Sequence, residues 1–286
     1  MKSRIALVAL VALCGFSLLG AYAIETRVKL SLGEAAAIGK VGSTTTVNKF
    51  GRNQDSDTTE DAIYEGSDLG GPIRCFADIG TTAVALYAFS DDEADAAKVV
   101  TVEAIDANWD VSLIDVTLGA DTLSGGTAAA QVGTKTLLSV NRAFAKSTAL
   151  VGNIYINADN VDDGDGVPTN VATKLVTGIV IGENQTLQAC YTVPSGFNAL
   201  MTQYCTSVIN TAANATALLR IRKSVEGAAS RVQEIHEQAE STYQCTQHEP
   251  PIKFSEKTDI ELTSVGSGNN GAVSGTFDLI LMPNTM

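Results

Sequence analysis

Residues 259–282, DIELTSVGSGNNGAVSGTFDLILM, show the pattern that decides the fold. Apolar and polar residues alternate in DIELTSV (259–265) and in GTFDLILM (275–282), and a cluster of Gly, Ser and Asn separates the two runs. Alternation with period two is typical of a strand that buries one face, and such clusters are typical of turns. The stretch therefore predicts two β-strands joined by a loop.

The same pattern recurs through most of the chain. Further alternating runs are VALYAFS (84–90), KVVTVEAI (98–105), TLLSVNRAF (136–144), GNIYINA (152–158) and ALMTQYCTSV (199–208). One segment, SRVQEIHEQAES (230–241), instead places Val232, Ile235 and Ala239 at helical spacing. We still expect a strand there, because it lies between two clear strands and the connections then stay short.

We predict an all-β fold, with an extended N-terminal arm followed by two β-sandwich (jelly-roll-like) domains. The arm covers residues 24–68, which are poor in large apolar side chains, and the sandwiches cover 69–165 and 166–286. The boundary is set by NADNVDDGDGVPTN (157–170), a turn-forming stretch. The alternative is that this stretch is a long loop within one sandwich.

Composition limits the partners of the chain. The 286 residues are 45% hydrophobic, which is enough for a sizeable core, and carry a formal charge of −13. Phosphate binding needs clustered Lys and Arg, so we expect no nucleic-acid partner.

The first 23 residues resemble a secretory signal. Lys2 and Arg4 give a basic start, residues 5–19 are uncharged and apolar, and Ala21 and Ala23 are the small residues that a signal peptidase requires. We expect Sec export with cleavage after Ala23, no lipid anchor, and no membrane contact once this leader is removed. The alternatives are a retained hydrophobic tail or a misassigned start codon.

Four cysteines follow the leader: Cys75, Cys190, Cys205 and Cys245. An even number permits two disulfides, with three pairings. Cys190 and Cys205 flank a turn at Pro194 and Gly196, so we expect these two to be neighbours; buried free thiols are the alternative.

Two acidic stretches are candidate cation sites. In residues 49–71, Asn53, Asp55, Asp57 and Asp61 occupy the first, third, fifth and ninth positions of a calcium-loop-like pattern. An EF-hand also needs Gly at the sixth position and Glu at the twelfth, where this chain has Thr58 and Tyr64. In the second stretch the candidate ligands are Asp159, Asp162, Asp163 and Asp165. Their spacing fits no known loop, so we expect at most weak calcium binding there, with a solvated turn as the alternative.

Catalytic patterns are missing from the sequence. It contains no nucleophile elbow, no H-E-x-x-H motif and no phosphate-binding glycine loop, and the two histidines fit no zinc pattern. We expect no enzyme and no cofactor; a secreted hydrolase remains the third candidate, because any acidic protein contains carboxylate pairs.

Five segments, in this order, are similar to a known group of proteins. They are KFGRNQDSDTTEDAIYEG (49–66), VTVEAIDANWD (100–110), LLSVNRAFAKS (137–147), IGENQTLQACYTVPSGFNALM (181–201) and FSEKTDIELTSVGSGNNGAVSGTFDLILM (254–282). Together they resemble virion structural proteins of tailed marine bacteriophages, over residues 45–282. The group usually carries Trp where this chain has Tyr64.

The resemblance implies a β-sandwich protein of the capsid surface or tail, without enzymatic activity, that binds other virion proteins and self-associates into homo-oligomers. It also implies that residues 49–71 are an arm that docks on a neighbouring subunit. A virion protein that assembles in the cytoplasm has no use for an export signal. The leader therefore favours the alternative, a secreted bacterial adhesin or surface-layer-like protein that binds cations or glycans.

The leader yields the first prediction. Its three parts match what the export machinery reads, so we expect N-terminal sequencing of the native protein to start at Ile24. An intact Met1 would contradict this expectation and would strengthen the virion interpretation.

Overall fold

The computed structural model describes residues 32–72, 75, 82–120, 125–210, 216–239, 241–268 and 271–284. The chain divides into two compact units, Met1–Gly42 and Ser43–Met286. The described part of the first unit contains a short helix, α2 (Leu32–Ala37). The leader and its expected cleavage position lie outside the described residues. Where the chain is described, no helix is long and apolar enough to cross a membrane.

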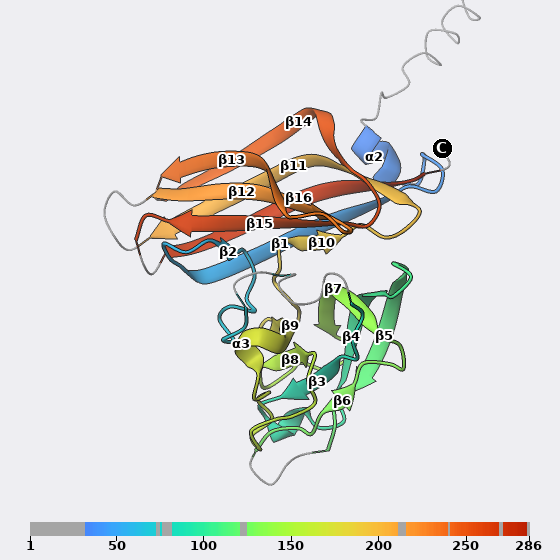
Figure 1. Ribbon diagram of the computed structural model, residues 1–286, viewed down its shortest axis with the longest axis vertical. Coiled ribbons are helices and arrows are strands. Elements are labelled where there is room, and N and C mark those ends of the chain that lie inside the picture. Colours follow the sequence, from blue (N-terminus) through green and yellow to red (C-terminus); the bar gives the residue numbers. More distant parts are fainter. Residues whose placement is uncertain are drawn as a thin grey trace, which may run out of the picture. The chain divides into compact units, whose positions relative to one another are not determined.

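The second unit is built from antiparallel sheets, which confirms the all-β prediction (Figure 1). The first sheet, sheet A, has the order β1-β16-β11-β14. Its strands are β1 (Thr45–Ser56), β16 (Gly271–Pro283), β11 (Phe197–Asn210) and β14 (Thr242–Phe254). The second, sheet B, has the order β10-β15-β12-β13, and β2 also pairs with β15. Its strands are β2 (Asp61–Ala62), β10 (Cys190–Thr192), β12 (Thr216–Val225), β13 (Arg231–Ala239) and β15 (Thr258–Gly266).

Sheets A and B share one hydrophobic core. The alternation in the sequence explains it: Phe277 and Leu279 of β16 and Ile260 and Leu262 of β15 are at most 2% exposed and pack in the same cluster. These are the apolar residues of the two runs at 259–265 and 275–282. The expectation that both runs are strands is confirmed.

Two smaller sheets enclose a second core. Sheet C has the order β5-β4-β7 and sheet D the order β6-β3-β8-β9. Their strands are β3 (Tyr87–Ser90), β4 (Val99–Asp106), β5 (Val111–Thr117), β6 (Ala130–Gln131), β7 (Leu137–Ala145), β8 (Ile154–Asn157) and β9 (Leu175–Ile179). Two helical turns, η1 (Glu93–Asp95) and α3 (Val171–Lys174), lie in the connections. Val102, Val140, Ile154 and Ile156 are among the core residues.

The predicted arm is incorporated into a sheet instead of lying outside the fold. Residues 45–53 of β1 pair continuously with β16, from Thr45 opposite Leu281 to Asn53 opposite Val273. Gly51 lets β1 also approach the segments at Ile63 and Ala189 closely, because a Cβ there would collide with their backbone. The first strand of the unit therefore pairs with the last.

The acidic stretch 157–170 connects two paired strands of one sheet, sheet D, and does not separate two sheets. Strands β8 and β9 pair on either side of it, with Ile154 opposite Ile179. Of the two alternatives given by the sequence, the pairing supports the loop, so the expected division at 165 does not coincide with a break between sheets.

Strand β14 runs through Pro250 and Pro251, although proline has no N–H to donate to a ladder. Two features accommodate the prolines: β14 is an edge strand, and the register with β11 shifts between Met201 and Gln203. The neighbouring segment β13 is a strand, as expected, despite its helical spacing.

The disulfide expectation is wrong. The structure pairs Cys75 with Cys190 and Cys205 with Cys245. The turn at Pro194 does connect β10 to β11, but β10 belongs to sheet B and β11 to sheet A, so Cys190 and Cys205 are not cross-strand neighbours. Cys205 instead lies directly opposite Cys245 in the β11–β14 ladder.

A buried polar network joins β7 to residues 188–192, a segment that includes β10. The Asn141 side chain accepts a hydrogen bond from the Thr192 N–H (2.8 Å) and donates to the Thr192 carbonyl (3.3 Å). The Gln188 amide donates to the carbonyls of Val140 and Asn141, both at 2.8 Å. Lys49 of β1 also donates to the Asn141 carbonyl. Each of these side chains is at most 6% exposed, so these hydrogen bonds replace those to water.

Lys49 gives a pH-dependent prediction. Burial, against the partial compensation of Glu103, lowers its pKa from 10.5 to about 7. Between these two values the unfolded chain binds more protons than the folded one, so stability rises with pH. We expect the free energy of unfolding to rise by a few kcal/mol from pH 7 to 10, at about 1.4 kcal/mol for each unit of pKa shift.

In Lys49→Met this rise should be lost, and the protein should be more stable than wild type at pH 6. The Asn141 carbonyl keeps its hydrogen bond from Gln188, so the variant leaves no acceptor unpaired. Lys253→Met, which changes an exposed lysine of β14, is the control and should keep the wild-type slope. Urea unfolding at several pH values measures the slopes; equal slopes for Lys49→Met and wild type would contradict the prediction.

Candidate functional site: an acidic pocket

An open pocket of about 600 Å³ is lined by four aspartates. Its described lining residues are Gln54, Asp55, Asp57, Asp61, Ser67, Asp68, Leu69, Gly71, Asn153 and Val180. All four aspartates belong to the stretch 49–71 that the sequence identified as acidic. None of these described lining residues is Lys, Arg or His, so the pocket wall is anionic.

An irregularity in the β1–β16 ladder places Asp55 at the pocket. The register shifts between Asn53, which lies opposite Val273, and Ser56, which lies opposite Gly271. Two residues of β1, Gln54 and Asp55, therefore face a single residue of β16, as in a β-bulge, and both are exposed. Bulges commonly redirect side chains next to functional sites.

Asp61 is the buried member of the group. It lies in β2, opposite Ser264 of β15, and is 6% exposed. Its Oδ1 atom is inaccessible to solvent and has no hydrogen-bond partner. Burial, and then the negative charges of Asp57, Asp55 and Glu60, raise the pKa of Asp61 to about 6.

Of the other aspartates, Asp57 is tied to the backbone: it accepts a hydrogen bond from the Thr59 N–H at 2.5 Å. Asp68 is exposed, yet desolvation by the surrounding protein raises its pKa, against the opposing charge of Arg52. The pocket therefore holds two carboxyl groups that are harder to ionise than usual.

Sequence reasoning found this site in part. It named Asp55, Asp57 and Asp61, but also Asn53, which is fully buried and accepts the Asp55 N–H at 2.9 Å instead of lining the pocket. It missed Asp68 and Asn153. The SDLGG turn at 67–71 could have suggested Asp68, whereas no local signal indicates that Asn153 lies nearby.

The structure does not bring the aspartates of the second acidic loop together around one point. Asp159 accepts the Asn170 side-chain amide (2.8 Å), and Asp162 and Asp163 accept the backbone N–H groups of Gly164 (2.8 Å) and Asp165 (2.9 Å). Asp163 and Asp165 are exposed. No three of these four described carboxylates lie within 4.8 Å of one another. The hydrogen bonds form local turns, and the expectation of at most weak calcium binding at this loop stays a prediction.

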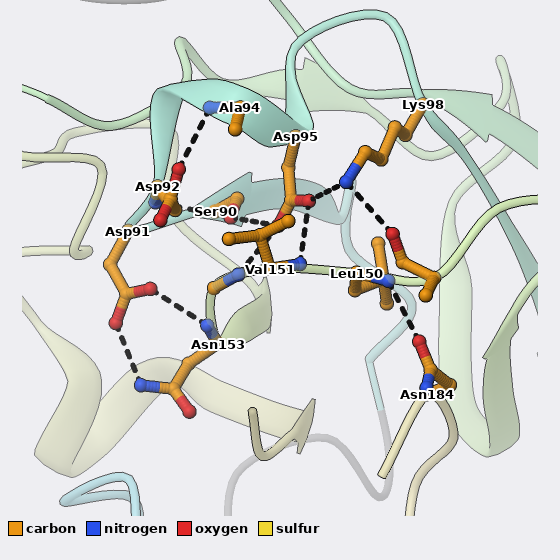
Figure 2. Close-up of polar contacts among 12 residues, drawn as sticks. Ser90, Asp91, Asp92, Ala94, Asp95, Lys98, Leu150, Val151, Asn153 and Asn184 are labelled. Carbon is orange, nitrogen blue, oxygen red and sulfur yellow. Dashed lines mark hydrogen bonds and ion pairs between the residues drawn. The ribbon is translucent and has the colours of Figure 1, made fainter. Parts of the chain in front are cut away.

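A third acidic group, at the end of β3, is fully used by the fold (Figure 2). Asp95 accepts hydrogen bonds from Ser90 (2.7 Å), Lys98 (2.7 Å) and the Val151 and Gly152 N–H groups (2.8 and 3.0 Å). Asp91 similarly accepts two from Asn153, both at 2.7 Å. These carboxylates connect the end of β3 and η1 to the loop before β8.

Glu60, next to Asp61, is held by two arginines of β12. Arg220 contacts it at 2.6 Å, Arg222 contacts it through two nitrogens, and Thr263 donates at 2.6 Å. Although burial favours the neutral form, the hydrogen bonds from Arg222 and Thr263 and the charges of both arginines lower the pKa of Glu60 to about 2. This clamp fixes the chain immediately before the pocket's buried carboxylate.

Comparisons with known proteins do not assign the site. No protein-family model matches the chain, and no curated protein does. Among solved structures, the mitogen derived from Yersinia pseudotuberculosis is 9% identical, with 32% of this chain and 82% of that chain covered. TmCBM61, in complex with β-1,4-galactotriose, is 16% identical over 33% and 59%. The cowpea mosaic virus top component, a naturally occurring empty particle, is 8% identical over 71% and 85%. All three TM-scores are 0.20, which carries no argument about function.

The Glu60 clamp gives a stability prediction. Glu60→Ala leaves Arg220 and Arg222, whose side chains are 21% and 17% exposed, without their carboxylate. We expect a loss on the order of 2 kcal/mol in the free energy of unfolding, measured by urea denaturation in EGTA.

Glu226→Ala is the matched control, since Glu226 pairs with Lys257 at 2.9 Å on the surface, with side chains 47% and 35% exposed. Its loss should be about 0.5 kcal/mol or less. Equal losses for the two variants would show that the clamp contributes no more than a surface ion pair.

Proposed function

We propose that the protein is a non-enzymatic structural component of a tailed-phage particle, at the capsid surface or the tail. It acts through protein–protein assembly, with other virion proteins and with further copies of itself. In this proposal sheets A and B, and sheets C and D, are two jelly-roll-like sandwich domains. The ordered sequence resemblance over residues 45–282 motivates the proposal.

The observation that carries it is an exposed apolar edge. Strands β13 and β14 are the edges of sheets B and A, and no other described strand pairs with their outer sides. Val232, Ile235 and Tyr243 on these strands are 39%, 53% and 71% exposed. Long edge strands offer unpaired N–H and C=O groups for strand addition, and soluble monomers usually protect them. A second copy of the chain, or a neighbouring virion protein, would cover this edge.

A second candidate is a secreted surface protein that binds cations or glycans. The two disulfides, Cys75–Cys190 and Cys205–Cys245, favour it, because disulfides persist in oxidising compartments. The signal-like leader points the same way. Both candidates predict that the mature protein is found outside the host cell. They differ in the compartment in which it is assembled.

Mass spectrometry separates the two candidates. In a host culture infected by the phage that encodes the gene, we expect peptides of this chain in particles purified on a density gradient. They should remain in a fixed ratio to the major capsid protein through a second gradient. Absence from the particles, with the protein present in the culture supernatant, would overturn the proposal in favour of the secreted surface protein.

A further inference from the structure

The two disulfides that join described residues differ in how far solvent reaches them. Cys75 and Cys190 are 8% and 0% exposed and lie together in a small hydrophobic cluster. In the second disulfide Cys205 is 3% exposed, but its partner Cys245 is an exposed residue. A disulfide opens when a thiolate attacks one of its sulfurs, so access to a sulfur decides which of the two bonds reacts.

The position of the second disulfide in sheet A favours attack at one of its two sulfurs. Cys205 lies in β11, between β14 and β16, with Cys245 opposite it on one side and Thr276 on the other. Cys245 lies in the edge strand β14, and no described strand pairs with the outer side of β14 (Figure 1). The attacking thiolate approaches along the line of the two sulfurs. From the open edge this line leads to Cys245, whereas from the other direction it is occupied by β16.

The side chains around the two sulfurs suit this direction of attack. The Gln203 side-chain amide donates a hydrogen bond to Cys205 Sγ at 3.0 Å. When Cys205 departs as a thiolate, this hydrogen bond gains a charged acceptor and becomes stronger. The Tyr243 hydroxyl donates to Cys245 Sγ at 3.0 Å, and Tyr243 is 71% exposed, so its side chain can move aside for an incoming thiol.

We propose that the Cys205–Cys245 disulfide is an exchange site for small thiols, which attack it at Cys245. The incoming thiolate forms a bond to the Cys245 sulfur, the bond between the two protein sulfurs breaks, and its electron pair leaves on Cys205, which takes a proton from water. A second small thiolate then attacks the mixed disulfide and releases Cys245 as a thiol, with a small-molecule disulfide as the other product. Two small thiols are oxidised and one protein disulfide is reduced.

The exchange would remove the covalent tie from one half of the β11–β14 ladder. Residues 242–247 pair with residues 203–208, and a register shift between Met201 and Gln203 separates this half from the rest of the ladder. This half is therefore closed covalently in an oxidising compartment and held by hydrogen bonds alone in a reducing one, whereas the buried disulfide stays closed for longer. The site does not depend on whether the chain assembles into a particle.

The experiment follows both disulfides in the folded full chain during incubation with reduced glutathione. Samples are quenched with acid, free thiols are alkylated, and peptide mass spectrometry locates them. We expect Cys205–Cys245 to open about tenfold or more faster than Cys75–Cys190, because only the first exposes a sulfur at a sheet edge. The first mixed disulfide should carry glutathione on Cys245. In concentrated urea, where both disulfides are accessible, the difference in rate should disappear.

A variant tests the hydrogen bond to the leaving sulfur. In Gln203→Leu we expect the exposed disulfide to open severalfold more slowly, since the Cys205 thiolate loses its donor. Gln244→Leu changes an exposed neighbour of Cys245 and is the control, which should open at the wild-type rate. Circular dichroism checks folding, and the wild-type rates decide the test if Gln203→Leu does not fold.

Two results would overturn the inference in the folded wild type. One is opening of the buried disulfide at the same rate as the exposed one, or faster. The other is glutathione found first on Cys205 instead of Cys245. An unchanged rate in Gln203→Leu would remove Gln203 from the mechanism.

Discussion

The fold depends on a few buried amides that have no water to bond to. Asn141 contacts the backbone of Thr192 through both side-chain atoms, and Gln188 contacts the carbonyls of Val140 and Asn141. A buried polar group that loses its partner costs about 1–3 kcal/mol, so each contact here is specific in a way that apolar packing is not. Hydrophobic burial holds each pair of sheets together, whereas this network determines which residues of β7 meet the segment entering β10.

The acidic groups of the chain show how burial and pairing together set the pKa of a carboxylate. Asp95 and Glu60 are satisfied by cations and backbone donors, and their pKa values lie below the usual range. The pKa of Asp61 lies above it, since burial removes water and the neighbours add negative charge. Desolvation also raises the pKa of Asp68, against the opposing charge of Arg52. The net charge of −13 could not distinguish these groups, because their difference comes from residues far apart in sequence.

Much of the fold could be predicted from alternation alone. The runs at 259–265 and 275–282 became β15 and β16, because period-two alternation reports a buried face directly. Pairing partners could not be predicted, since alternation does not say which strand lies alongside. Cys205 therefore joined Cys245 instead of Cys190, and residues 45–56 became a sheet strand although they contain few large apolar side chains. The candidate site was found in part: Asp55, Asp57 and Asp61 follow one acidic pattern, whereas Asn153 lies far away in the sequence.

The pairing of β1 with β16 has a consequence for synthesis. Thr45 meets Leu281, so sheet A stays incomplete until β16 has been made. Sheets C and D use only residues 87–179 and their contacts are closer in sequence, so their core can form while the remainder is still on the ribosome. During that interval β1 waits as a solitary strand with its partner not yet translated. During synthesis β1 therefore needs protection from other chains until β16 (Gly271–Pro283) has emerged.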